Sequence, residues 1–350
     1  MRPDQELRII ATGAPPSLVR AFTACVFAAC VAGAARSQDG GDLDRAYDAL
    51  LGPRTDAAPT DAPTDPLDVA LEPEPSDWHF DLAIGFQQIS RAGLDQGPGD
   101  VERRGTIVGL TAHSGADEDD WRFTYRFESR TYRFDGASGL LPGTSEPIES
   151  TYRHRFGTAR GFDLSKRLSA RFDAEVDLGS EVAFEVSDAL TWIAILGASW
   201  RIDDTFSLSL DVRAQDRLED DVAFVPVPGF DWRIDDRTRL RVDATGLELT
   251  RDLERGARAY VSTRYQDVEI RLDDTGPNPG GSFAERGFLT RAGILFDPGV
   301  GGHSVSSSTL DLFVGVAHAR EIEFRAGGVE VGGDDVDPSA YFGLELTLRF

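Results

Sequence analysis

The chain has 350 residues, with 36 lysines and arginines against 60 aspartates and glutamates, which gives a formal net charge of −24. This acidity argues against nucleic acid as a partner, because phosphate groups require a basic surface. The length admits either two ordinary domains or one large β-domain, so the pattern of elements along the chain has to decide between them.

The first segment with a recognisable pattern is residues 21–35, "AFTACVFAACVAGAA", the longest small and apolar run. It is short for a helical membrane span, and a small-x-small motif ends at Ala34, so residues 1–34 are expected to be a secretory signal peptide. A buried helix, or a lipid anchor at Cys30, is the alternative. Cys25 and Cys30 are the only cysteines, so the cleaved chain would contain no thiol.

Residues 35–76 are rich in Pro, Ala, Asp and Thr and poor in bulky apolar residues. Such a segment cannot bury enough surface to offset the entropy of ordering it, so we expect a disordered acidic periplasmic linker. The folded domain is expected to start near Trp78 and to occupy residues 77–350.

From residue 77 onward the apolar residues recur with a period of two, which indicates β-strands. The clearest example is Trp121 to Glu128, where aromatic residues alternate with charged and polar ones. The last ten residues, "YFGLELTLRF", alternate in the same way and end on Phe350. The expected fold class is therefore all-β.

The spacing of the strands predicts a transmembrane antiparallel β-barrel of about 14 strands, with 12 as the alternative. Short connections alternate with longer ones, including 135–147 and 325–338, which is typical of bacterial outer-membrane barrels. Most runs approach the roughly 10 residues that a tilted strand needs to cross a bilayer. A soluble periplasmic β-protein would also show alternation and remains an alternative.

Four tryptophans are expected at one end of the barrel, because each precedes the first strand or adjoins a short turn. An aromatic girdle at one membrane interface requires this placement, and we assign the girdle to Trp78, Trp121, Trp200 and Trp232.

The turns "DLSKRL", "RIDDTF" and "RIDDRT", the segment "FVPVPGFDWRIDD" and the closing "YFGLELTLRF" resemble an uncharacterised family of porin-like outer-membrane β-barrels. The resemblance covers residues 78–350. It implies the barrel fold, a location in the bacterial outer membrane, and Phe350 as the signal for the barrel assembly machinery. It implies no substrate and no catalytic residues.

The face opposite the apolar one carries both charges and is expected to line the lumen. Neighbouring strands lie about 4.8 Å apart, so these side chains can meet across the ladder as a salt-bridged wall, or form a constriction that selects solutes. The candidates are Arg122, Arg126, Arg130, Glu128, Glu149, Arg153, Arg155, Arg171, Asp173, Glu175 and Asp177.

The sequence therefore favours porin-like passive diffusion of small hydrophilic solutes. The alternative is a closed structural or binding barrel whose acidic loops hold partners or divalent cations. No hydrolase or phosphate-loop motif is present, and the five histidines lie on separate predicted strands, so no enzyme, cofactor or metal site is expected. The expected partners are outer-membrane lipid, the assembly machinery and small solutes.

Overall fold

The computed structural model describes residues 78–95, 97–114, 121–181, 189–219, 222–254, 256–297 and 307–350. The expected signal peptide and linker lie outside these ranges. Within them every regular element is a strand. None of the described segments forms a helix long and apolar enough to span a membrane.

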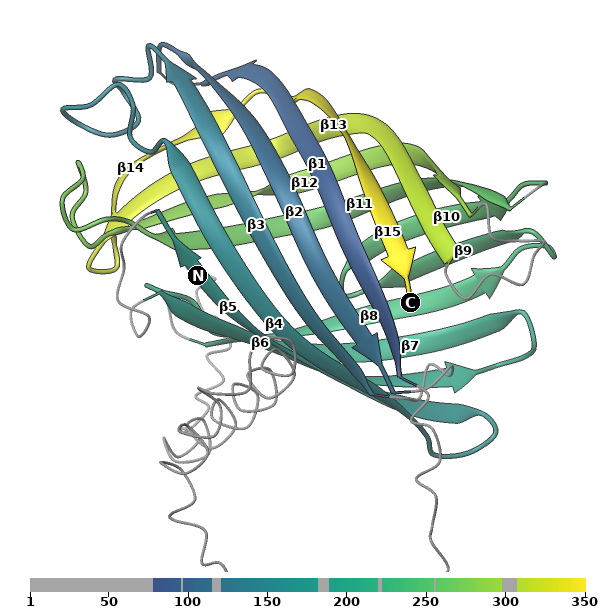
Figure 1. The fold of residues 1–350 in the computed structure, drawn as a ribbon. Coiled ribbons are helices and arrows are strands. Elements are labelled where there is room, and N and C mark those ends of the chain that lie inside the picture. The colour runs from purple at the N-terminus through teal and green to yellow at the C-terminus, as the bar shows by residue number, and fades with distance from the viewer. Residues whose placement is uncertain are drawn as a thin grey trace, which may run out of the picture. The chain divides into compact units, whose positions relative to one another are not determined.

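Fifteen strand segments follow one another along the chain (Figure 1). They are β1 (His79–Gly93), β2 (Asp100–His113), β3 (Arg122–Asp135), β4 (Ser150–Asp163), β5 (Leu168–Ser180), β6 (Leu190–Arg201), β7 (Phe206–Gln215), β8 (Ala223–Arg233), β9 (Thr238–Asp243), β10 (Gly246–Asp252), β11 (Ala257–Arg271), β12 (Ser282–Phe296), β13 (Ser307–Ala326), β14 (Val329–Val336) and β15 (Ser339–Arg349).

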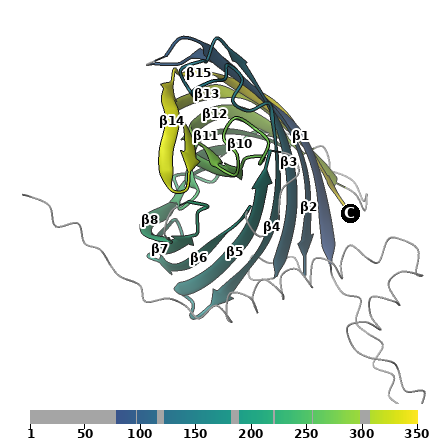
Figure 2. The same ribbon diagram turned by 90° about the vertical axis from the view of Figure 1, so that its left-hand side faces the viewer.

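The sheet closes on itself. Each strand from β1 to β13 pairs antiparallel with the next, β13 pairs with β15, and β15 pairs with β1. Both β14 and β15 run along β13, one after the other, and they are separated only by Asp337 and Pro338. They therefore act as one interrupted strand, and the barrel has 14 strands, as the sequence predicts. Figure 2 shows the closed barrel from one end.

Side chains alternate between the two faces of the barrel wall. Large apolar residues point outward and are exposed, as Ile84, Leu196 and Val314 illustrate with exposed fractions of 50%, 63% and 65%. Inward positions on the same ladder carry polar groups, such as Gln87 on β1 and Glu128 on β3, and both are buried. An apolar exterior around a polar interior is the reverse of a soluble β-barrel and is what a membrane requires.

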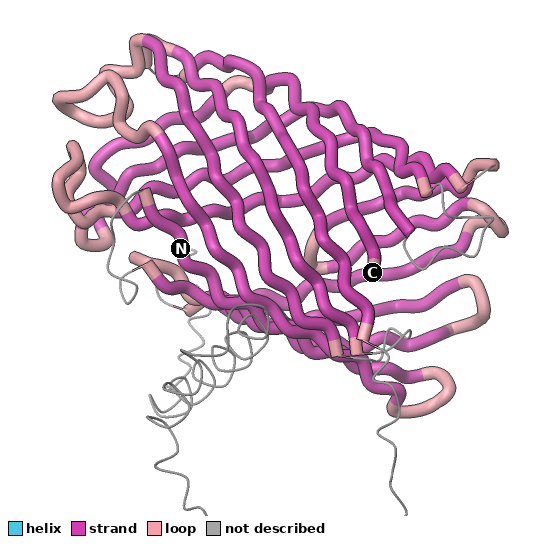
Figure 3. The backbone as a smooth tube through the Cα atoms, in the orientation of Figure 1, coloured by secondary structure: helices cyan, strands magenta, loops and turns pink. Residues whose placement is uncertain are grey.

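The short turns share one local structure. The Asp203 carboxylate accepts hydrogen bonds from the Thr205 hydroxyl and backbone N–H, each at 2.7 Å, and the Asp235 carboxylate accepts one from the backbone N–H of Arg237 at 2.8 Å. Such side-chain to backbone bonds close tight turns. The same bonds, first that of the Thr205 hydroxyl, lower the pKa of the Asp203 carboxyl. Figure 3 shows these turns at one end of the barrel and longer loops at the other.

The β9–β10 hairpin is much shorter than its neighbours and leaves part of the wall unpaired. Strand β8 pairs with β9 only from Phe230 to Arg233, so its first half has no partner on that side. Pro226 and Pro228 lie in this unpaired half. Proline cannot donate a ladder hydrogen bond, so this edge is a poor template for an added strand.

One connection differs from expectation. The segment 325–338 is predicted to be a long loop, but β13 continues to Ala326 and β14 begins at Val329. Gly327 and Gly328 make the turn with φ angles of 58° and 79°. Glycine adopts this left-handed conformation without a Cβ clash, so two glycines suffice where a loop was expected.

Candidate functional site

The long-loop end of the barrel interior is filled by an apolar plug. The sixteen buried residues of this plug come from β1 to β3, β11 to β14 and the loop between β3 and β4. Aromatic rings form its centre, with the Phe283 ring centroid 5.3 Å from those of Tyr132 and Phe324. The loop after β3 contributes Leu140 and Leu141, which are almost completely buried.

Ile148 belongs to the plug, although the sequence pattern places it on the outward face of a strand. Strand β4 begins only at Ser150, and Ile148 lies in the loop with 2% of its surface exposed. The match of Ile148 to the alternation of β4 is therefore accidental. A loop that turns back into the barrel buries apolar residues without any strand period.

Two opposite walls touch beside the plug. The backbone N–H of Glu181, just after β5, donates to the carbonyl of Arg271 at the end of β11. Gly179 makes this approach close, because a Cβ there would lie 2.9 Å from the Glu269 carbonyl oxygen. At this level β11 therefore crosses to β5, and the plug lies on the side of the barrel formed by β1 to β5 and β11 to β15.

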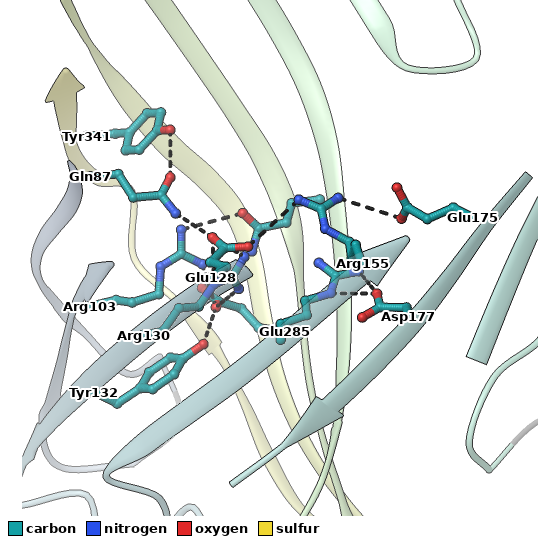
Figure 4. A network of polar contacts seen from close by, with 12 residues as sticks. Gln87, Arg103, Glu128, Arg130, Tyr132, Arg155, Glu175, Asp177, Glu285 and Tyr341 are labelled. Atoms are coloured by element: carbon teal, nitrogen blue, oxygen red, sulfur yellow. Dashed lines mark hydrogen bonds and ion pairs between the residues drawn. The ribbon is translucent and has the colours of Figure 1, made fainter. Parts of the chain in front are cut away.

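A buried charge network lies next to the plug (Figure 4). Its centre is Glu285 on β12, whose carboxylate accepts a hydrogen bond from Arg103 at 2.6 Å, one from Arg320 at 2.9 Å and one from the Tyr132 hydroxyl at 2.8 Å. Arg130 lies 3.6 Å from the same carboxylate. All five side chains are buried, so every charge in this group has a partner where water is scarce.

A second carboxylate extends the network toward β15. Glu128 accepts two hydrogen bonds from Arg130, at 3.0 and 2.9 Å, and one from the Gln87 amide at 2.6 Å. The Gln87 side-chain oxygen in turn accepts a hydrogen bond from the Tyr341 hydroxyl at 3.0 Å. Figure 4 shows this chain of contacts running from Tyr341 to Glu128. We call these residues and the Glu285 group together the buried charge network.

Among the residues proposed from sequence, four are buried at this level: Glu128, Arg130, Arg153 and Asp177. Arg153 and Asp177 form their own ion pair between β4 and β5. The structure brings these groups together as a wall of paired charges. Their role in selecting solutes remains a prediction.

The other proposed lumen residues are less buried. Arg171 pairs bidentately with Asp211 of β7, at 3.2 and 2.6 Å, and Arg122 reaches Asp173 at 3.4 Å. Glu149 does not join them, because it is exposed in the loop before β4. Arg126, Arg155 and Glu175 line a cavity described below.

The sequence pattern did not single out Arg103, Glu285 and Arg320, each at most 2% exposed. Arg103 and Glu285 lie on positions that the period of two places in the lumen. The period of β13 instead puts Arg320 on the outward face with Val316, and a bulge at Ala319, whose φ is 48°, turns Arg320 inward. Which strands face one another across the lumen depends on closure and tilt, and a local pattern cannot supply that.

Two polar cavities lie in the lumen. The larger, of about 550 Å³, lies at the short-turn end and is lined by β4 to β9, with His113 of β2 and Arg122 of β3. The smaller, of about 310 Å³, lies farther along β4 to β7 and is also lined by β1 to β3, β11 to β13 and β15, beside the buried charge network. The two adjoin along the strands: Asp173 and Asp211 line the first, while Glu175 and Arg213, two residues further on, line the second. We call them the entry cavity and the central cavity.

The four girdle tryptophans lie where the short turns are. Trp78 and Trp121 directly precede β1 and β3, while Trp200 and Trp232 lie near the ends of β6 and β8. All four are exposed, with fractions from 36% to 56%. Phe350 is exposed beyond β15, and its backbone N–H donates to the Phe80 carbonyl at 2.9 Å. Membrane-interface and assembly roles for these residues remain predictions.

A closed antiparallel barrel, an apolar outer band and a charged interior define the class of this protein: it is a transmembrane β-barrel of the bacterial outer-membrane type.

No protein-family model matches the sequence, and no curated protein matches it. Among solved structures it is similar to an outer-membrane channel from Pseudomonas putida F1 (10% identity, 82% of this chain and 100% of the other, TM-score 0.38). It is also similar to the P. putida toluene transporter TodX (8%, 79% and 89%, TM-score 0.35) and to the KdgM porin in complex with disordered oligogalacturonate (7%, 77% and 98%, TM-score 0.29). At these identities and scores, the likenesses bear on neither substrate nor mechanism.

Proposed function

We propose that this barrel is an outer-membrane channel for passive diffusion of small hydrophilic solutes. The observation that carries the proposal is the pair of adjoining polar cavities in the lumen. Their lining is charged, and they extend from the short-turn end to the level of the buried charge network. Beyond the central cavity, the plug fills the side formed by β1 to β5 and β11 to β15, and β5 touches β11. The path therefore continues on the side of β6 to β8, past the unpaired half of β8.

A closed barrel is the second candidate, and the plug itself favours it. Apolar side chains and paired charges fill the lumen on the side of the plug, from β1 to β3 across to β11 to β14. A protein built this way would serve as a structural or binding element, with acidic loops that hold partners or divalent cations.

We propose no catalytic role. The two histidines on outward positions have neighbouring hydroxyl partners: His154 with Tyr125 at 3.1 Å, and His318 with Thr290 at 2.9 Å. These bonds satisfy polar groups that would otherwise face lipid unpaired. These histidine–hydroxyl pairs face lipid, where no water-soluble substrate would reach them.

Purified protein in planar lipid bilayers tests the proposal. Stepwise, steady single-channel currents are expected, smaller than those of an unobstructed barrel with the same number of strands because the plug fills part of the lumen. Protein heat-denatured before addition is the control and should give no steps. Folded protein that inserts but carries no current would refute the channel and support the closed barrel.

A further inference from the structure

The two lumen cavities are basic, although the chain as a whole is strongly acidic with a net charge of −24. The entry cavity is lined by seven arginines and Lys166 against five aspartates. The central cavity is lined by seven arginines against five carboxylates. Arginine is therefore in excess at both levels of the proposed path, and the low-dielectric wall around a lumen strengthens the resulting positive potential.

Arg126 and Arg155 contribute the least compensated part of this charge. They lie directly opposite each other on β3 and β4, both on inward positions. Cross-strand neighbours have Cβ atoms about 5 Å apart, and like charges at that separation destabilise a sheet. Arg155 approaches carboxylates only at 3.7 and 3.9 Å, and Arg126 makes no ion pair with any described residue.

Arg213 on β7 lines the same central cavity and makes no ion pair within the described part of the chain. The buried Nε atoms of all three arginines, Arg126, Arg155 and Arg213, have no hydrogen-bond acceptor. The other four central-cavity arginines have carboxylate partners. Arg130 and Arg153 hold Glu128 and Asp177, and Arg264 and Arg291 lie 3.7 Å from Glu248 and Asp311. Three weakly compensated guanidinium groups thus line one cavity of about 310 Å³.

We infer that the central cavity binds small oxyanions, carboxylate or phosphate, on Arg126, Arg155 and Arg213, and that the channel prefers anions. The planar fork of a guanidinium matches the two oxygens of a carboxylate or phosphate. An anion between Arg126 and Arg155 would relieve the repulsion that the strand register imposes. The anion preference rests on the proposed channel function, whereas the binding site does not require passage.

Binding is measured first, without any current. The thermal unfolding midpoint of the barrel in detergent is recorded against inorganic phosphate, and separately against succinate, at constant ionic strength. Each is expected to raise the midpoint of the wild type. The double variant Arg126→Gln/Arg155→Gln should lose at least tenfold in apparent affinity. It should still fold, because the change removes a like-charge contact.

Arg104→Gln is the matched control, since Arg104 is an exposed arginine on β2 that pairs with Glu102. It should respond to both anions like the wild type. An equal response of wild type and double variant to both anions would overturn the site. A response to phosphate alone or to succinate alone identifies which oxyanion the site accepts and supports it.

Ion selectivity is then measured as the reversal potential under a tenfold KCl gradient. Anion preference is expected for the wild type, with a shift toward cations in the double variant. Currents that show cation preference would overturn the anion-selective path while leaving the channel intact. Anion binding without any current would refute the channel and leave the oxyanion site standing.

Discussion

Replacing Glu285 with glutamine (Glu285→Gln) is expected to destabilise the barrel by about 3–5 kcal/mol, as for other buried ion pairs that lose one partner. The Glu285 carboxylate contacts Arg103 at 2.6 Å and Arg320 at 2.9 Å, and all three side chains are at most 2% exposed. Glutamine keeps the shape but removes the charge, so two buried guanidinium groups lose their counter-ion. The free energy of unfolding, measured by urea titration in lipid vesicles, reports the loss.

Asp252→Asn is the control for this change. Asp252 pairs with Arg258 at 2.7 Å, but both side chains are more than half exposed. Exposed ion pairs contribute about 0–1 kcal/mol, so little change in unfolding free energy is expected. Equal effects of the two substitutions would mean that the Glu285 group is not buried as described.

Replacing Leu140 with aspartate (Leu140→Asp) is expected to release the loop between β3 and β4 from the plug. Leu140 is 1% exposed among aromatic and aliphatic side chains, and an unpaired carboxylate there costs at least about 3 kcal/mol. Because each 1.4 kcal/mol is a factor of ten, the open loop should become on the order of a hundredfold more populated. Cleavage of the loop by protease added to folded protein should accelerate accordingly.

Ser145→Asp provides the matched comparison, because Ser145 lies in the same loop but is exposed. The cleavage rate of this variant should stay near that of the wild type. Single-channel conductance adds a second readout, since a displaced loop leaves more lumen free. If Leu140→Asp leaves the loop as resistant as before, the loop does not form part of the plug.

The exterior of the barrel could be predicted from the sequence, because lipid imposes one simple rule on every strand. Residues such as Phe123 and Tyr125 had to face outward, because they alternate with arginine and threonine, and the count of 14 strands follows from the same period. The short turns were equally readable, since an aspartate, as at Asp203 and Asp235, closes a turn by accepting a hydrogen bond from the backbone N–H two residues later.

For the interior, the sequence predicts which types of residue lie in the lumen but not which of them contact one another. The alternation places Glu128 and Arg130 in the lumen, but their partners Gln87 and Glu285 are separated from Glu128 and Arg130 by 41 and more than 150 residues. The plug left no local signal either, because Leu140 and Ile148 come from an irregular loop. Contacts across a lumen depend on closure of the whole sheet, which no window of ten residues contains.

The central claim is that apolar side chains face lipid while the alternate ones face water inside the barrel. Cysteine scanning of β6 from Ala194 to Ser199 tests it, after Cys25 and Cys30 are replaced by serine; Gly197 is left out because Asp211 and Arg171 leave no room for a side chain. We expect a membrane-impermeant thiol reagent to label Ile195 and Ser199 positions in intact vesicles, and a lipid-borne quencher to reach only Ala194, Leu196 and Ala198. Labelling without alternation, or a protein that stays folded and soluble without detergent or lipid, would contradict the account.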